Sequence, residues 1–228
     1  MPGWEKGWDS FLFDSVGTLG AGAGLAGAGI GAFGDMDDPA QAKAASSMGL
    51  IGGLSKMFTS AGGMRKAVKN KSVLGGFASG FGLASGAADA VTNGMALAGV
   101  DKKKVGIAKG VSGALGAVGG GLGIANAIAN RKKKPAGETA ANIIGSAGGI
   151  LGGVGKMLSG FGGSNSKAGK VGKWMGLAGA GLGFLGSAGG LLGRIFGKKK
   201  EPDGSGGSGS GGAGAANDDW VDVQNGNE

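Results

Sequence analysis

The apolar positions of this chain fall into six long runs separated by short charged or polar segments. The runs cover residues 15–34, 44–64, 72–100, 110–130, 139–155 and 174–193, and DMDDP, RKAVKNK, DKKK and RKKKP separate successive runs. A half-buried strand would alternate with period two, whereas small residues here recur every three or four positions. The pattern therefore predicts an all-α fold, in which Gly/Ala-rich helices pack as hairpins.

Glycines follow a heptad spacing most clearly in the first and last runs. Steps of three and four residues place them on one face of a helix, where the absence of side chains lets another backbone approach closely. We expect these seam glycines to form the helix contacts: Gly17, Gly20, Gly24, Gly27, Gly31 and Gly34, then Gly176, Gly179, Gly183, Gly186, Gly190 and Gly193.

This spacing resembles the glycine zippers of membrane-active proteins, a loose class that includes pore-forming antibacterial effectors and bacteriocin-like toxins. The resemblance covers about residues 15–197 and is one of pattern alone. It implies membrane insertion, oligomerisation and loss of ion gradients. In lipid, the cost of unpaired backbone groups enforces helix even where glycine would weaken a helix in water.

Composition narrows the function classes further. The 228 residues include 59 glycines, and no cysteine, histidine or tyrosine. Disulfides, histidine metal sites and histidine general bases are therefore excluded, and no P-loop motif occurs. We expect no enzyme activity and no cofactor.

Positive charge is concentrated in the body of the chain. The net charge is +8, and six acidic residues but no lysine or arginine follow Lys200, so residues 1–200 carry +14. Such a body favours anionic lipid as partner, while short basic clusters without aromatic platforms disfavour nucleic acid. The expected lipid-binding residues are Trp4, Trp8, Trp174, Lys102, Lys103, Lys104, Lys132, Lys133, Lys134, Lys198, Lys199 and Lys200.

Three runs, 15–34, 110–130 and 174–193, are long enough to span a membrane. Basic clusters fall between nearly all runs from Arg65 onward, so positive charge would lie on both sides if every run crossed. That is unusual for a resident membrane protein. With no basic signal-peptide region at the start, we expect a protein that is soluble when made and is then secreted or delivered to a target membrane.

Asp89 is the one carboxylate within an apolar run. In lipid it would be costly, and it could line a polar lumen together with Asn93. The alternative, which the surrounding SGAADAVTNG favours, is a solvated turn.

Three regions are expected: an amphipathic segment at 1–14, a helical membrane-active region at 15–200, and a Gly/Ser linker with an acidic tail at 201–228. The segments LIGGLSKMFTSAGG at 50–63 and ILGGVGKMLSGFGG at 150–163 indicate an internal duplication of about 100 residues, or a chance match of low-complexity sequence. The tail is either disordered or a docking peptide for a loader, chaperone or immunity protein.

Together these patterns predict a protein that inserts as a homo-oligomer and permeabilises a target membrane, as a secreted antibacterial toxin would. One alternative is a virus or phage minor structural protein that inserts in a membrane for genome delivery. Another is a soluble bundle of glycine-rich helices. Apolar outer faces would favour lipid, and polar outer faces would favour solubility.

Overall fold

Six long helices make up the computed structural model, which describes residues 5–69, 71–132, 136–163 and 166–196. No strand occurs within these ranges, so the all-α prediction is confirmed. The expectations for the acidic tail and for Lys198–Lys200 lie outside them. In chain order the helices are α1 (Glu5–Phe33), α2 (Pro39–Lys69), α3 (Val73–Leu97), α4 (Lys102–Ala129), α5 (Ala136–Phe161) and α6 (Lys167–Phe196).

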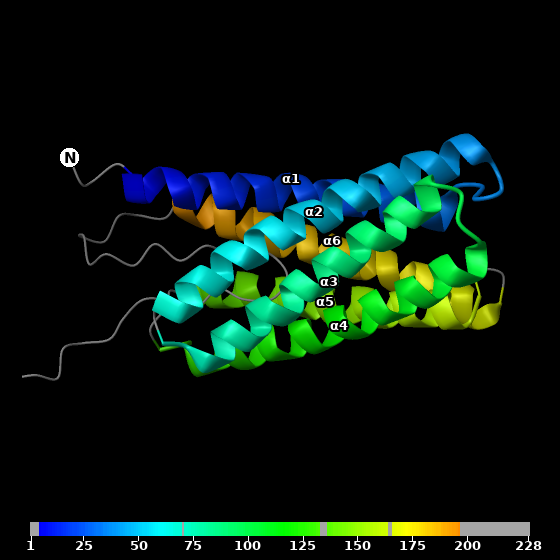
Figure 1. Cartoon of the computed structure of the whole chain (residues 1–228). Coiled ribbons are helices and arrows are strands. Elements are labelled where there is room, and N and C mark those ends of the chain that lie inside the picture. Colours follow the sequence, from blue (N-terminus) through cyan, green and yellow to red (C-terminus); the bar gives the residue numbers. More distant parts are fainter. Residues whose placement is uncertain (1–4, 70, 133–135, 164–165, 197–228) are drawn as a thin grey trace, which may run out of the picture.

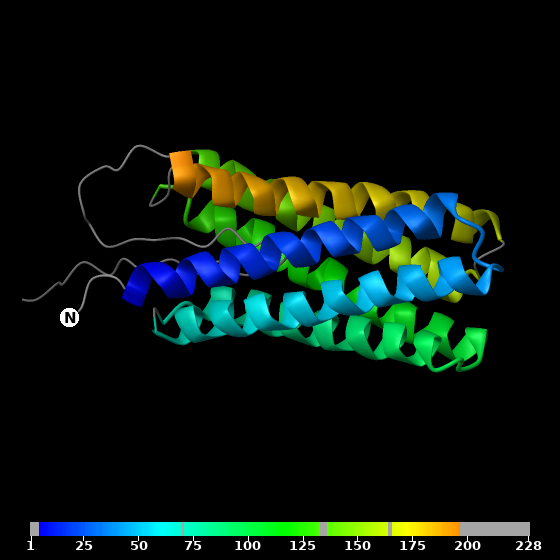
Figure 2. The same ribbon diagram turned by 90° about the horizontal axis from the view of Figure 1, so that it is seen from above.

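The helices form an antiparallel ring (Figures 1 and 2). Each helix packs against the helices that precede and follow it, and α1 also meets α6, which closes the ring. Within the described part of the chain, no other pair of helices makes a backbone contact. Helices three steps apart, such as α2 and α5, therefore occupy opposite positions in the ring.

Local sequence signals fix where the helices begin. Asp38 accepts a hydrogen bond from Ala40 N (2.9 Å) ahead of Pro39, the first residue of α2. Ser72 accepts one from Gly75 N (3.1 Å) at the start of α3, and Asp101 accepts one from Lys103 N (2.9 Å) at the start of α4. Each side chain satisfies a helix N–H that has no partner within the helix.

The turn from α3 to α4 shows why one of the glycines lies at a helix end. Val100 N donates to Met95 O and Gly99 N donates to Ala96 O, which is the Schellman pattern. Gly99 has φ +73°, a conformation that L side chains rarely adopt. The chain can therefore reverse within a few residues and place α4 beside α3.

Small residues fill the space between helices. The buried apolar residues of the described chain are four alanines, and the largest fully buried side chains are serines and Asp14. Large apolar side chains are instead exposed on every helix, as shown by Leu19, Val68, Phe77 and Leu185. Close backbone packing thus takes the place of a core of large side chains.

Candidate functional site

Helices α5 and α6 approach each other closely through glycines. A Cβ atom on Gly148 would lie 2.5 Å from Gly183 N, and one on Gly155 would lie 2.5 Å from Gly176 N. A Cβ on Gly186 would lie 2.6 Å from Gly145 Cα. Real Cβ contacts are not this short, so these positions accommodate only glycine unless the helices separate.

A second glycine face of α5 packs against α4. A Cβ on Gly153 would lie 2.5 Å from Gly113 O, and one on Gly120 would lie 2.6 Å from Ser146 O. The contact between α2 and α3 is similar, because a Cβ on Gly53 would lie 2.8 Å from Ala90 N. Glycines on α5 therefore hold that helix between two neighbours.

Only some of the predicted seam glycines of α1 have a neighbouring helix close to their Cβ position. Cβ atoms on Gly20 and Gly27 would meet α2, at Ser55 and at Ala45 O (3.1 Å). Gly34 lies beside Gln41 after α1 ends, and Gly17 is half-buried. No atom lies within 4 Å of a Cβ position on Gly24 or Gly31. The backbone of Gly24 is nevertheless covered by α2, since a Cβ on Gly52 would lie 3.4 Å from Gly24 Cα. The seam of α1 thus contacts α2 at Gly20, Gly24 and Gly27.

The predicted seam of α6 alternates in a comparable way. Gly179 and Gly186 would place a Cβ atom into the backbone of α5, whereas the Cβ positions of Gly176 and Gly183 are open. The backbone nitrogens of Gly176 and Gly183 are nevertheless covered by glycines of α5, as described above. Gly190 is buried and Gly193 lies within α6.

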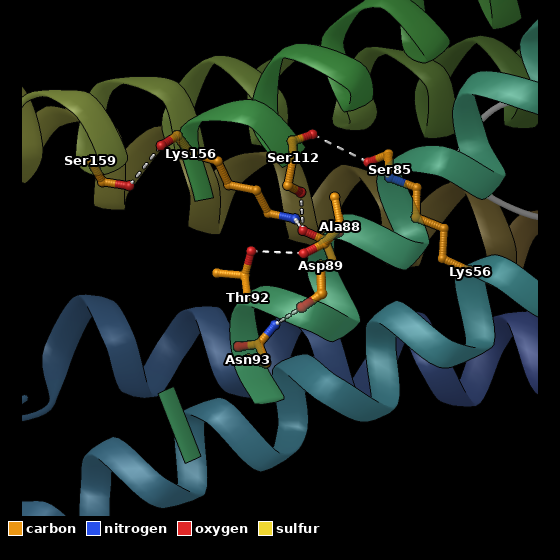
Figure 3. A network of polar contacts seen from close by, with 9 residues as sticks. All are labelled: Lys56, Ser85, Ala88, Asp89, Thr92, Asn93, Ser112, Lys156 and Ser159. Carbon is orange, nitrogen blue, oxygen red and sulfur yellow. Dashed lines mark hydrogen bonds and ion pairs between the residues drawn. The ribbon is translucent and has the colours of Figure 1, made fainter. Parts of the chain in front are cut away.

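A polar cluster lies inside the ring, in contrast to the small apolar residues of the helix contacts (Figure 3). Lys156 on α5 places Nζ 2.5 Å from Oδ1 of Asp89 on α3. Ser112 on α4 donates a short hydrogen bond to the same oxygen. Lys56 on α2 donates to Ser85 Oγ (2.8 Å), and Ser85 Oγ donates to the main-chain oxygen of Ser112 (3.3 Å).

Asp89 is buried within α3, so the expectation of a solvated turn is wrong. The helix continues through SGAADAVTNG because its polar side chains bond locally or across the ring. Thr92 donates to Ala88 O (2.7 Å), and Asn93 donates to the main-chain oxygen of Asp89 (2.8 Å), not to its carboxylate. The carboxylate oxygen Oδ1 of Asp89 instead accepts from Lys156 and Ser112.

Burial and the neighbouring opposite charges shift the pKa values of Asp89 and Lys56 in opposite directions. Burial raises the pKa of Asp89, but Lys156 and Lys56, with hydrogen bonds from Lys156 and Ser112, hold that pKa below its ordinary value. Burial lowers the pKa of Lys56 to about 8, although Asp89 partly offsets this effect. Asp89 therefore stays ionised at neutral pH.

The two similar segments at 50–63 and 150–163 each contribute a lysine to this cluster. Lys56 and Lys156 hold equivalent positions in LIGGLSKMFTSAGG and ILGGVGKMLSGFGG, 100 residues apart. They lie on α2 and α5, at opposite positions in the ring, and both act electrostatically on Asp89. The sequence analysis selected Asp89 but missed these lysines, which the repeated Lys-Met pair could have indicated.

The outer surface of the bundle is rich in large apolar side chains. Leu19 on α1 is 72% exposed and Leu185 on α6 is 60% exposed. Three helices are long and apolar enough to cross a membrane, within Leu12–Phe33, Lys102–Ala129 and Lys167–Leu192. These segments overlap the three predicted spans. The apolar outer faces are those expected of a bundle that contacts lipid.

The expected lipid-binding residues are spread over several places. Trp174 is exposed and makes an edge-on contact with Phe33, with ring centroids 5.1 Å apart. Lys102, Lys103, Lys104 and Lys132 are exposed. Trp8 lies in α1, which continues without a break past residue 14. Trp4, Lys133 and Lys134 lie outside the described residues.

The two ends of the ring differ in charge. The start of α1, the α2–α3 and α4–α5 turns and the end of α6 lie together at one end (Figure 1). We call this the basic end, defined by exposed Arg65, Lys69, Lys71, Arg131 and Lys132. The opposite end, the mixed end, combines Asp35, Asp37, Asp38 and Asp101 with Lys102, Lys103, Lys104 and Lys167.

No family model, curated protein or solved structure matches this chain. The functional argument therefore depends on the geometry and chemistry described above.

Proposed function

We propose that this protein inserts into a target membrane, oligomerises there and permeabilises the membrane, as a secreted antibacterial toxin would. The observation that carries the proposal is the inverted distribution of side chains. Glycine, alanine and serine lie at the contacts between helices, and the charged cluster around Asp89 lies inside the ring. Large apolar side chains are instead exposed on the outer surface. In water that outer surface is unfavourable, whereas in lipid it is solvated by acyl chains.

The ring also satisfies the backbone requirement of a bilayer. Nearly all its described backbone is helical, and the α1–α2 and α3–α4 turns, which are described in full, are short and hydrogen-bonded. Helices that approach through small residues are stabilised by van der Waals contact, which does not require water. The fold can therefore remain packed after its outer surface meets lipid.

Oligomerisation is supported by α1, the least covered of the three helices that could span a membrane. Gly24 and Gly31, which are one heptad apart, have no atom within 4 Å of their Cβ positions. Leu19 is exposed on the same helix. A second copy of the chain could approach α1 closely at these two open Cβ positions.

Dye leakage from vesicles of anionic and neutral lipid tests the proposal. We expect leakage that rises steeply with protein concentration and is stronger on anionic lipid. Leu19→Lys together with Leu185→Lys should abolish insertion, because each central lysine costs about 3 kcal/mol in lipid. Ala136→Lys, at the exposed start of α5, adds positive charge near the basic end and should retain leakage.

The outcomes separate the competing functions. Binding without leakage would overturn permeabilisation and favour the genome-delivery alternative. Absence of binding to either lipid would favour a soluble glycine-rich bundle. Equal leakage by the Leu19→Lys, Leu185→Lys variant would show that the apolar outer surface is not the membrane-contacting surface.

A further inference from the structure

The polar cluster around Asp89 carries more positive than negative charge. Besides Lys56 and Lys156, Lys109 on α4 interacts electrostatically with Lys156, with Asp89 and with Lys173 on α6. All four lysines are half-buried. Lys56, Lys156 and Lys109 thus interact electrostatically with Asp89, and Lys173 interacts with Lys109.

Two of these lysines lie inside the ring, because each reaches a helix that its own helix does not contact. Lys56 Nζ on α2 lies 3.8 Å from the Cβ position of Gly116 on α4. Lys156 on α5 reaches Asp89 on α3. Neither α2 and α4 nor α3 and α5 are neighbours within the described chain, so these contacts cross the interior.

Surplus positive charge in such a place has a physical consequence. Like charges that are withdrawn from water repel one another and disfavour the charged state of each amine. A mobile anion that enters the cluster relieves both effects, and rings of lysine or arginine select anions in pores for this reason. The serine hydroxyls of Ser85 and Ser112 add polar groups between the lysines.

We propose that Lys56, Lys109, Lys156 and Lys173 form a site for small inorganic anions such as chloride, and that this site makes the permeabilised membrane anion-selective. The selectivity rests on the proposed permeabilising function. Asp89 limits the site by neutralising one of the four lysines, and it therefore sets the strength of anion attraction.

Reversal potentials in planar bilayers under a tenfold potassium chloride gradient test this inference with the full-length protein. We expect chloride to permeate in preference to potassium. Lys56→Gln with Lys156→Gln should lower the chloride-to-potassium permeability ratio at least about fivefold, because two interior charges are lost. Lys43→Gln with Lys170→Gln removes the same charge from exposed positions and should leave the ratio within about twofold of the original.

Two further variants keep the test decisive if the double glutamine variant does not fold. Lys109→Gln removes a lysine that has no part in the Asp89 ion pair, and it should lower the ratio. Asp89→Asn removes the negative charge and should raise it. Circular dichroism establishes that each variant is helical before it is measured.

Failure of this inference can be told from failure of the proposed function. If the original protein conducts without preferring chloride, or if Lys109→Gln and Asp89→Asn leave the ratio unchanged, the anion site is overturned while permeabilisation stands. If the original protein gives no conductance and no leakage, permeabilisation is overturned and the selectivity falls with it.

Discussion

Lys156 and Asp89 form an ion pair between two helices that do not pack against each other. Nζ lies 2.5 Å from Oδ1, and the pair joins α5 to α3 past the intervening α4. Ser112 of α4 donates to the same carboxylate oxygen. Three consecutive helices are thereby held together by one buried group, in a bundle that lacks a core of large apolar side chains.

Loss of either charge should destabilise the bundle more than loss of both. Asp89→Asn and Lys156→Met should each lower the free energy of unfolding by about 2 kcal/mol, less than for a fully buried pair because the Lys156 side chain is 35% exposed. The double variant should recover at least half of the summed loss, since no unpaired charge remains from the pair. Urea unfolding followed by circular dichroism measures the cycle, and strictly additive losses would contradict coupling.

The same carboxylate predicts acid sensitivity. The folded-state pKa of Asp89 lies below its ordinary value, so the unfolded state takes up a proton first as the pH falls. The stability that Asp89 contributes is thus fully present above its unfolded pKa of about 3.9, and it is lost as the pH falls through the folded value. The groups that act on this carboxylate are Lys156, Lys56, Lys109 and Ser112.

Measurement of unfolding free energy from pH 7 to pH 2 checks this expectation. The difference between the original protein and Asp89→Asn should be largest at neutral pH and should shrink toward zero in acid. A difference that stays constant across the range would show that Asp89 acts through shape or hydrogen bonding and not through its charge.

Much of the fold could be predicted because local rules dominate it. The apolar runs and the charged segments between them predict six helices. Ser72 caps α3 where the run 72–100 begins, whereas Asp101 caps α4 nine residues ahead of the run 110–130. The spans at 15–34, 110–130 and 174–193 overlap the helices that are apolar enough to cross a membrane. Period and composition are properties of neighbouring residues, so one sequence suffices for them.

The interior site could not be predicted to the same extent because it depends on ring closure. Asp89 can be selected from the sequence because it is the one carboxylate within an apolar run. Its partners, however, lie far along the chain: Lys156 is 67 positions after it and Lys56 is 33 positions before it. A heptad spacing of glycines predicts a packing face, but it does not determine which neighbouring helix each glycine contacts. Gly179 contacts α5, for example, whereas Gly24, in the same kind of seam, contacts nothing through its Cβ position.

Gly179 and Gly181 offer a matched test of glycine packing on α6. A Cβ on Gly179 would lie 2.6 Å from Gly152 Cα and 2.7 Å from Gly148 O, whereas the position on Gly181 is open. Both alanine variants gain up to about 1 kcal/mol of helix propensity. Only Gly179→Ala must separate two helices, which costs about 1 to 3 kcal/mol.

Thermal unfolding followed by circular dichroism should therefore show Gly181→Ala as stable as the original protein or more so, and Gly179→Ala as less stable. Leakage activity should follow the same order if the α5–α6 contact persists in the membrane. Equal behaviour of the two variants would mean that close approach at Gly179 does not contribute to stability.

The basic end should be the first part of the bundle to meet an anionic membrane. Lys69, Lys71, Arg131 and Lys132 are exposed there, and the described residues of the α2–α3 and α4–α5 turns carry no aspartate, although Glu5 begins α1 and Glu138 lies in the first turn of α5. At the mixed end, by contrast, Asp37 pairs with Lys102 (3.2 Å). Each cation close to an anionic surface contributes about 1 kcal/mol. Glutamine at these four basic-end positions should therefore weaken binding to anionic vesicles by at least about tenfold at low salt.

The matched control replaces Lys102, Lys103, Lys104 and Lys167 at the mixed end, which removes the same formal charge. Its binding should fall less, because aspartates already weaken the positive potential there, and the gap between the two variants should close at high salt. Vesicle co-sedimentation across salt concentrations measures both effects. Equal losses would indicate attraction by total charge, whereas unequal losses give the bundle a defined orientation as it approaches lipid, with the α2–α3 and α4–α5 turns leading.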